Sequence, residues 1–302
     1  MATKPFVIAI VGPTASGKSE LAVQIAKKLN GEIISADSRQ VYRGMDIGTG
    51  KVEGKWRGDK YFYKSIRHYG LDITNPRTQY SVAKFQNYAK KAIAEILAQG
   101  KVPIICGGTG YWTDSVLFDQ SIPAVKPNPN LRKKLEKLSA TLLFTKLKKL
   151  DPTRAQNIDA GNPRRLIRAL EIIIATGKPI PALSRKIKYD VLWLGITHDK
   201  TTLDKRIDKR LDERLKLGMI KEVKKLRASG LSWKRLEDFG LEYKFIAQFL
   251  QKKFTESEMR SLLSTAIKQY AKRQITWFKR NKDIQWIKNV SQALSIIKKH
   301  HA

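Results

Sequence analysis

Residues 12–19 read Gly-Pro-Thr-Ala-Ser-Gly-Lys-Ser, which matches the phosphate-loop pattern G-x-x-x-x-G-K-[ST]. Glycines in such a loop let backbone N–H groups close around an anion at a helix N-terminus. Lys18 adds a positive charge for the terminal phosphates, and Ser19 supplies the hydroxyl that usually binds Mg²⁺. We therefore expect a polyphosphate and Mg²⁺ here, unless the match is a chance turn that binds nothing. The loop residues are Gly12, Pro13, Thr14, Ala15, Ser16, Gly17, Lys18 and Ser19.

The segments around the loop predict an α/β fold. An apolar, β-branched stretch at 6–11 precedes the loop, and apolar residues at helical spacing follow it over 19–29. Further strands are expected at 32–36, 102–106 and 190–196, with a helix over 81–99. This alternation predicts a P-loop NTPase-like parallel sheet with helices on both faces. Ligands of such sheets bind at the carboxyl ends of the strands.

Polar turns follow two of these strands. Asp37 closes the strand at 32–36, where an acid can hold Mg²⁺, accept a proton from a nucleophile, or merely cap the next turn. Thr109 lies in Gly107-Gly108-Thr109-Gly110, a turn whose N–H groups and hydroxyl suit an anion, although the turn can also be purely structural. The phosphate loop follows a third strand in the same way. Because these three turns lie at one edge of the sheet, they are predicted to form one site.

The rest of the chain reads as helical. Three prolines within 123–129 end the sheet pattern, and we interpret 120–180 as a helical insertion between 1–119 and 181–302. One of its helices is expected to be capped by Asn162, to have Pro163 in its first turn and to end at Gly177. Everything after residue 199 is expected to be helical. Arg206 and Arg210 share a helix face there and can pair with phosphate oxygens or simply remain solvated.

The charge of the chain indicates a polyanionic partner. The 302 residues carry a formal net charge of +32 and a pI near 10.2, which favours nucleic acid unless it reflects only a lysine-rich composition. Aromatic and cationic residues alternate over 270–280, a mixture that suits single-stranded nucleic acid. The alternative is an amphipathic helix, and both hold if Trp277 and Phe278 point inward while Lys272, Arg273 and Arg280 point outward.

The remaining composition excludes several classes of protein. Cys106 is the single cysteine, so an intrachain disulfide and a cysteine-built metal site are excluded, and its apolar surroundings predict burial. No signal segment and no apolar run of 18 residues is evident, so we expect a cytoplasmic protein without a membrane partner.

Taken in order, the motifs strongly resemble the tRNA dimethylallyltransferase family, also called tRNA isopentenyltransferases. The resemblance covers about residues 6–290 and rests on segments 12–19, 34–49 (Ile-Ser-Ala-Asp-Ser-Arg-Gln-Val-Tyr-Arg-Gly-Met-Asp-Ile-Gly-Thr), 80–85, 107–110, 163–171 and 271–277. It implies transfer of a dimethylallyl group from dimethylallyl diphosphate to N6 of the adenosine 3′ of the tRNA anticodon, with release of diphosphate. The implied partners are dimethylallyl diphosphate and the anticodon stem-loop, with no obligate protein partner.

The resemblance also implies roles for individual residues. Asp37 matches the acid that accepts the N6 proton, and Arg210 matches the arginine that stabilises the departing diphosphate. Lys18 and Thr14 complete the expected catalytic set, with Ser19 as the metal ligand. The tRNA-binding residues are expected to be Asp37, Ser38, Arg39, Gln40, Thr109, Arg132, Pro163, Arg164, Arg165, Leu166, Ile167, Lys272 and Arg273.

Three other functions fit parts of the sequence. A P-loop kinase of small metabolites explains the loop but leaves the segment at 270–280 without a role. An adenylate isopentenyltransferase that prenylates free AMP or ADP needs no large cationic surface. A non-catalytic RNA-binding protein on a P-loop scaffold leaves Lys18, Asp37 and Arg210 unexplained.

Overall fold

The computed structural model describes residues 4–181 and 186–300, and it separates into two compact units. The core unit consists of Met1–Asp119 and Lys186–Ala302, and the helical unit consists of Gln120–Arg185. Each is described here by itself. Among the described residues, no helix has the length and apolarity that crossing a bilayer requires.

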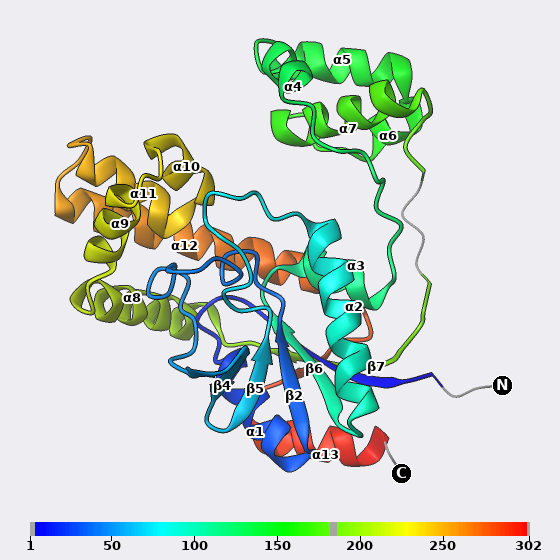
Figure 1. Ribbon diagram of the computed structural model, residues 1–302, viewed down its shortest axis with the longest axis vertical. Helices are drawn as coiled ribbons and strands as arrows, with labels where there is room; N and C mark the ends of the chain where they lie inside the picture. Colours follow the sequence, from blue (N-terminus) through cyan, green and yellow to red (C-terminus); the bar gives the residue numbers. More distant parts are fainter. Residues whose placement is uncertain (1–3, 182–185, 301–302) are drawn as a thin grey trace. The chain divides into compact units, whose positions relative to one another are not determined.

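The core unit is built on one sheet, which has eight strands within the described residues (Figure 1). Their spatial order is β3 (Lys55–Arg57), β4 (Lys60–Tyr63), β5 (Ile66–Tyr69), β2 (Gly31–Ser35), β6 (Val102–Gly107), β1 (Phe6–Val11), β7 (Asp190–Ile196) and β8 (Gln285–Ile287). The six strands from β5 to β8 pair in parallel, whereas β4 is antiparallel to both of its neighbours. The predicted α/β class is confirmed, and the four predicted strands do pair in parallel, but the sheet as a whole is mixed because of the β3–β4 hairpin.

Four strands were not predicted, and each lacks a buried apolar run. The residues of β3 are all exposed, and β4 joins it through the Gly58-Asp59 turn, so this hairpin at the sheet edge carries charged side chains. Strand β5 has only four residues, and β8 has three. Strand β8 also corrects the expectation that everything after residue 199 is helical, because it pairs with β7 through Trp286 and Gly195.

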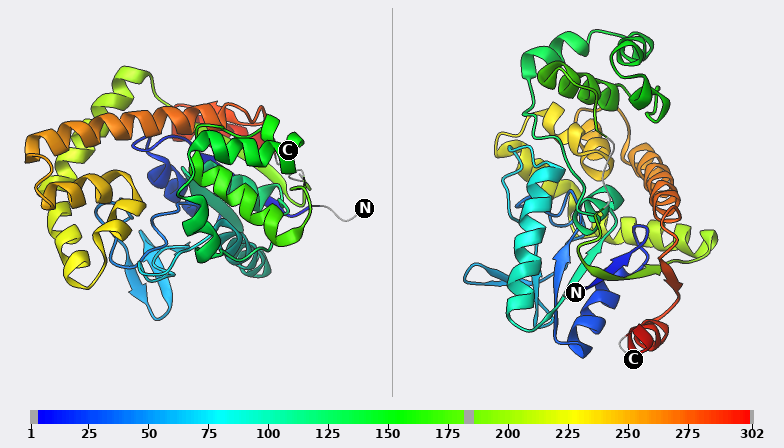
Figure 2. Two further views of the ribbon diagram at one scale, coloured as in Figure 1. Left: turned by 90° about the horizontal axis from the view of Figure 1, so that it is seen from above. Right: turned by 90° about the vertical axis from the view of Figure 1, so that its right-hand side faces the viewer.

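Helices cover both faces of the sheet because the side chains of its strands alternate (Figures 1 and 2). Ile8 and Ile10 pack with α1 (Lys18–Lys28) and α13 (Val290–His300). Val7 and Val11 face the larger core on the opposite side. That side includes α2 (Val82–Ala98), α3 (Gly110–Leu117), α8 (Lys200–Lys216), α9 (Met219–Ala228), α10 (Trp233–Phe239), α11 (Leu241–Leu250) and α12 (Glu256–Phe278).

The register of the central strands brings the predicted turns together. Strand β1 pairs with β6 and β7 so that Val11 lies opposite Gly107 and Gly195. Strand β2 pairs with β6 so that Ser35 lies opposite Cys106. The loops that follow β1, β2 and β6 therefore emerge at one edge of the sheet.

The helical unit contains α4 (Pro129–Leu135), α5 (Ala140–Leu150), α6 (Pro152–Gln156) and α7 (Pro163–Thr176) around its own apolar core. The predicted ends of the last helix are confirmed. The Asn162 side chain caps α7 by accepting the Arg165 N–H, Pro163 is its first residue, and Gly177 ends it in a left-handed conformation with φ 66°.

A buried carboxylate holds the helices of this unit together. Glu171 is fully buried and receives a bidentate pair from Arg132, at 2.8 and 2.7 Å, together with a bond from Arg168 and the Asn128 N–H. Burial alone would raise the pKa of Glu171, but these hydrogen bonds lower it to about 2. The ion pair joins α4 to α7.

We expect Glu171→Gln to destabilise the helical unit by about 2 kcal/mol, because hydrogen bonds to a charged group are lost. Hydrogen exchange of α5 and α7 in the full-length protein measures this free energy of local unfolding. Since the pKa of Glu171 lies below the ordinary 4.5, the stabilisation is complete above that pH and is lost as the pH falls toward 2. Exposed Glu136→Gln is the matched control. Equal protection in both variants would contradict the role of Glu171.

Candidate active site

The phosphate loop has unpaired groups that suit an anion. Gly12 approaches the Ile196 carbonyl so closely, with φ +148°, that a Cβ would lie 2.4 Å from that oxygen. The hydroxyl of Ser16 is buried and has no hydrogen-bond partner within the described residues. Within the same residues, the N–H groups of Lys18 and Ser19, in the first turn of α1, also find no acceptor. Unpaired donors at a helix N-terminus are the features by which such loops bind phosphate.

Three cations from two helices, α1 and α8, surround this loop. The Lys18 Nζ donates to the Pro13 carbonyl at 2.5 Å. Arg206 and Arg210, both on α8, donate to the Ala15 carbonyl at 2.8 Å and to the Thr14 hydroxyl, respectively. The sequence leaves open whether these arginines pair with phosphate oxygens or remain solvated, and α8 places both side chains against the phosphate loop.

Two of these cations have perturbed acidities. Burial lowers the pKa of Lys18 to about 8, and the charge of Arg210 adds to this effect, whereas Cys106 and Asp37 oppose it. Burial likewise lowers the pKa of Arg210 to about 9, with repulsion from Arg214 next. The site therefore holds more positive charge than its surroundings stabilise, and a bound anion would relieve this.

The opposite wall of the site carries the polar residues that follow β2 and β6. The Asp37 Oδ1 accepts the Arg39 N–H at 2.8 Å, so this oxygen holds the turn, as in the capping alternative. Its Oδ2 has no hydrogen-bond partner in the described part of the chain and remains available. The Thr109 Oγ1 accepts the Ser38 N–H at 3.2 Å, which ties the glycine turn to the Asp37 turn.

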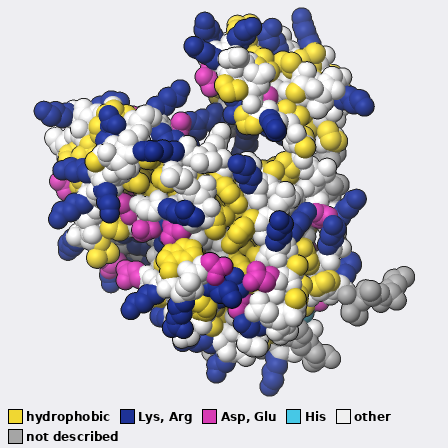
Figure 3. Space-filling view, in the orientation of Figure 1, with side chains coloured by type: hydrophobic (Ala, Val, Ile, Leu, Met, Phe, Trp, Pro, Cys, Tyr) yellow, Lys and Arg dark blue, Asp and Glu magenta, His cyan; other side chains and the backbone are white. Residues whose placement is uncertain are grey.

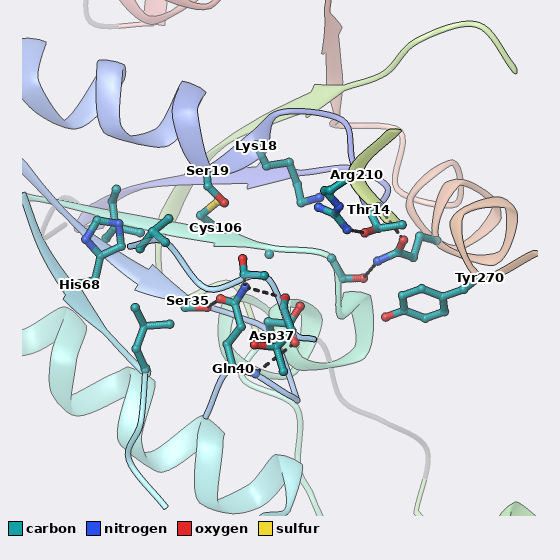
Figure 4. A pocket seen from close by; sticks show the side chains of 18 residues that line it. Thr14, Lys18, Ser19, Ser35, Asp37, Gln40, His68, Cys106, Arg210 and Tyr270 are labelled. Carbon is teal, nitrogen blue, oxygen red and sulfur yellow. Dashed lines mark hydrogen bonds between the residues drawn. The ribbon is translucent and has the colours of Figure 1, made fainter. Parts of the chain in front are cut away.

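Both walls line one pocket, shown in Figure 4. Lys18, Thr14 and Arg210 lie on one side of it, and Asp37, Gln40 and Tyr270 face them. The polar residues are continuous with an apolar part of the wall, which consists of Ile33, Val52, Leu71 and Cys106. Burial raises the pKa of the Cys106 thiol to about 11, so the expected burial of this residue is confirmed. A ligand with an anionic end and a short apolar end fits this lining.

Other predicted residues have partners of their own. Gln40 binds the Ser35 hydroxyl and the carbonyls of Thr49 and Gly50, so it holds a wall of the pocket. The Arg39 Nε donates to the Phe239 carbonyl. On α12, Lys272 and Arg273 are exposed, as expected, whereas Phe278 is buried.

The helical unit supplies the remaining predicted residues. Pro163, Arg164 and Arg165 are exposed at the start of α7. Leu166 and Ile167 are buried in the core of that unit, where they pack the helix that carries the exposed residues, and their role in binding tRNA stays a prediction. Arg132 pairs with Glu171, as described above.

Surface charge agrees with the composition of the chain. Lys and Arg side chains are spread over the visible face, whereas Asp and Glu gather in a few places (Figure 3). In the turn that follows α12, Arg280 lies over the Trp277 ring at 3.8 Å from its centre, and the Trp277 Nε1 donates to Asp114. The alternation at 270–280 therefore reflects an amphipathic helix whose cations face outward.

Sequence reasoning missed several residues of the site. Gln274 on α12 is buried and bonds both the phosphate loop and the glycine turn. Arg214 is buried beside Glu242, at 3.4 Å, and a Cβ at Gly50 would collide with its guanidinium. The interval of four from Arg210 was a signal for Arg214. The sequence contained no signal for Gln274, because a single glutamine in a basic segment resembles a surface residue.

Ser19 and Asp37 of the pocket offer oxygen donors for Mg²⁺. Within the described residues, no three His, Cys, Asp or Glu side chains gather as a metal site. Ser19 lines the pocket beside Lys18, and Asp37 lies across it. Mg²⁺ commonly binds through few protein oxygens while phosphate and water supply the rest. These residues therefore fit Mg²⁺ bound together with a polyphosphate.

Comparisons with known proteins agree with one another. A family model described as IPP transferase matches residues 40–281, and one described as isopentenyl transferase matches residues 5–67. The chain is 41% identical to a tRNA dimethylallyltransferase of Acetivibrio thermocellus, over 93% of this chain and 91% of that one. It is also 41% identical to one of Carboxydothermus hydrogenoformans, over 96% and 94%.

Solved structures give the same result. A tRNA isopentenylpyrophosphate transferase of Bacillus halodurans is 34% identical, with a TM-score of 0.71 over 99% of this chain and 95% of that one. A eukaryotic dimethylallyltransferase, captured acting on tRNA, is 29% identical, with a TM-score of 0.79 over 95% of this chain and 75% of that one.

The lowered pKa of Lys18 predicts that anion binding takes up protons. At pH 8.5 an amine with a pKa of about 8 is mostly neutral, and a bound anion restores its charge. Calorimetric titration of the protein with inorganic pyrophosphate, in two buffers of different ionisation enthalpy, should show about 0.5–0.8 proton more uptake than in Lys18→Arg, whose guanidinium stays charged. Exposed Lys28→Arg should behave as wild type. Equal uptake by Lys18→Arg and wild type would refute the assignment.

Proposed function

This chain belongs to the IPP transferase family of tRNA dimethylallyltransferases, and we propose that its pocket aligns dimethylallyl diphosphate with an adenosine of tRNA. The protein is a tRNA-modifying prenyltransferase. The proposed acceptor is N6 of the adenosine directly 3′ of the anticodon, and the proposed location is the cytoplasm. The core is proposed to be a P-loop NTPase-like domain that holds the diphosphate of an isoprenoid in place of a nucleoside triphosphate.

One observation carries this proposal: the pocket combines a cationic cradle, a short apolar wall and a free carboxylate oxygen. Lys18 and Arg210 suit a diphosphate, and Ile33 and Leu71 suit a five-carbon chain. The Asp37 Oδ2 is available for a proton. A nucleoside triphosphate would need space for a base and sugar where the lining is apolar.

The reaction is a displacement at the first carbon of the dimethylallyl group. The bond from N6 to this carbon forms while its bond to the diphosphate oxygen breaks, and the electron pair leaves with the diphosphate. N6 is a weak nucleophile because its lone pair is delocalised, so alignment and removal of its proton both lower the barrier. Asp37 accepts this proton. Arg210 and Lys18 stabilise the charge that builds on the diphosphate.

Mg²⁺ is proposed as the cofactor. Ser19 would bind it through its hydroxyl, beside the diphosphate. When bound, the ion neutralises charge on the leaving group. The N–H groups of Lys18 and Ser19 and the buried Ser16 hydroxyl are free to bind phosphate oxygens in the same place.

The tRNA is proposed to contact both units. In the core unit the contacts are Ser38, Arg39, Gln40 and Thr109 near the pocket, with the exposed Lys272 and Arg273 of α12. In the helical unit they are Arg132, Pro163, Arg164 and Arg165. The target base must leave its stack to reach Asp37.

The free adenylate and kinase alternatives predict other substrates. Mass spectrometry of products distinguishes them when the protein, with dimethylallyl diphosphate and Mg²⁺, is incubated separately with tRNA and with AMP and ADP, and, with ATP and Mg²⁺, with a panel of small kinase substrates. We expect one dimethylallyl group on one adenosine of unmodified tRNA, and no transfer to AMP, ADP or kinase substrates.

Asp37→Asn should reduce turnover by about 10²–10⁴-fold, because the amide cannot accept a proton. Its Oδ1 can still accept the Arg39 N–H, so the turn is preserved. Nucleoside mass spectrometry of tRNA measures the rate, and filter binding should show unchanged affinity for tRNA. Exposed Asp283→Asn is the control. Wild-type turnover in Asp37→Asn would show that another group takes the proton.

A further inference from the structure

Gln274 links the two walls of the active site. Its side chain is 6% exposed, its Oε1 accepts the Thr14 N–H at 2.8 Å, and its Nε2 donates to the Gly108 carbonyl at 2.8 Å. We propose that Gln274 is a positioning residue that sets the alignment between the departing diphosphate and the attacking amine. This inference rests on the proposed function.

The two bonds define which way the amide points. The Thr14 N–H can only donate and the Gly108 carbonyl can only accept, so the Gln274 oxygen must face the phosphate loop and its nitrogen the glycine turn. A glutamate would repel the carbonyl and add a negative charge beside the diphosphate site. A methionine has a similar length but makes neither bond.

Gln274 is the middle of a continuous chain of contacts across the pocket. At one end, Thr14 accepts a hydrogen bond from Arg210, the proposed stabiliser of the leaving group. At the other end, Thr109 follows Gly108 and accepts the Ser38 N–H beside Asp37, the proposed base. Figure 4 shows Thr14 and Asp37 on opposite sides of the pocket. The amide therefore couples the element that holds the leaving group to the element that holds the base.

The contact also explains why residue 108 must be small. A Cβ at Gly108 would lie 2.3 Å from the Gln274 Nε2, too close for any real contact. Its next neighbours would be the Gln274 Cδ at 3.4 Å and the Gly12 carbonyl at 3.5 Å, which are ordinary distances. An alanine at 108 therefore fits only if the Gln274 amide moves away, which breaks its bond to the Gly108 carbonyl, or if the side chain at 274 is shortened.

The expected consequence is a loss of rate with little loss of binding. Lys18 and Arg206 hold the phosphate loop independently of Gln274. The proposed tRNA contacts Lys272 and Arg273 point outward from the same helix. Displacement requires N6, the first carbon and the leaving oxygen to lie in line, and a misplacement of about 1 Å costs about 10²-fold in rate.

We expect Gln274→Met to lower the single-turnover rate of tRNA prenylation about 100-fold, while Kd values for tRNA and pyrophosphate change less than about threefold. Gln274→Glu should lose at least as much rate. Exposed Gln24→Met should react as wild type. An inactive wild type would refute the proposed function, whereas an active wild type with unimpaired Gln274→Met would refute this inference alone. Loss of both affinities in proportion to the rate would indicate a merely structural role and would also overturn it.

A double-mutant cycle tests the contact itself and does not depend on Gln274→Met being stable. Gly108→Ala and Gln274→Ala should each lower the rate about 100-fold, and the double variant should be no slower than Gln274→Ala. Such non-additivity corresponds to a coupling of about 2.7 kcal/mol. Multiplicative losses, with the double variant about 10⁴-fold slow, would overturn the proposal, as would wild-type activity in Gly108→Ala.

Discussion

Burial of positive charge beside the phosphate loop is the constraint on which this site depends. Lys18, Arg206 and Arg210 converge on one loop, and burial makes the charge of Lys18 and Arg210 costly. Their donors bind groups of the loop itself, namely two backbone carbonyls and the Thr14 hydroxyl. These bonds are local and easily exchanged for phosphate oxygens. A diphosphate bound at this loop, as we propose, would offset the positive charge.

The parts of the fold that could be predicted are those specified by local sequence. The strands at 6–11 and 190–196 have the predicted bounds because each is a continuous apolar run in the centre of the sheet. The caps at Asn162 and Gly177 are equally local. The hairpin of β3 and β4 and the strand β8 could not be found in this way. They exist because neighbouring strands offer free edges, and short segments with exposed side chains complete them.

The residues of the candidate site also divide into those that the local sequence predicts and those that it does not. The phosphate loop and Asp37 are predictable because each directly follows a buried strand. The residues that orient the phosphate loop and the segment around Gly48 come from distant helices: Gln274 is 260 residues from Thr14, and Arg214 is 166 from Gly48. Glu222, on α9, likewise accepts the N–H groups of Asp46, Ile47 and Gly48. No local pattern marks such contacts, because their partners are backbone groups whose positions depend on the whole fold.

Helix α12 shows how one segment can fit two interpretations at once, an exposed cationic surface and an amphipathic helix with a buried side. Its exposed side bears Lys272 and Arg273, and its buried side places Gln274 and Phe278 four residues apart. A pattern of aromatic and cationic residues describes the exposed side well. On the buried side, the same pattern makes Gln274 look like another surface residue. Burial distinguishes them: a polar side chain in a core must have partners, so a buried amide marks the groups that it holds in place. Here those groups belong to the two loops between which we propose that the reaction takes place.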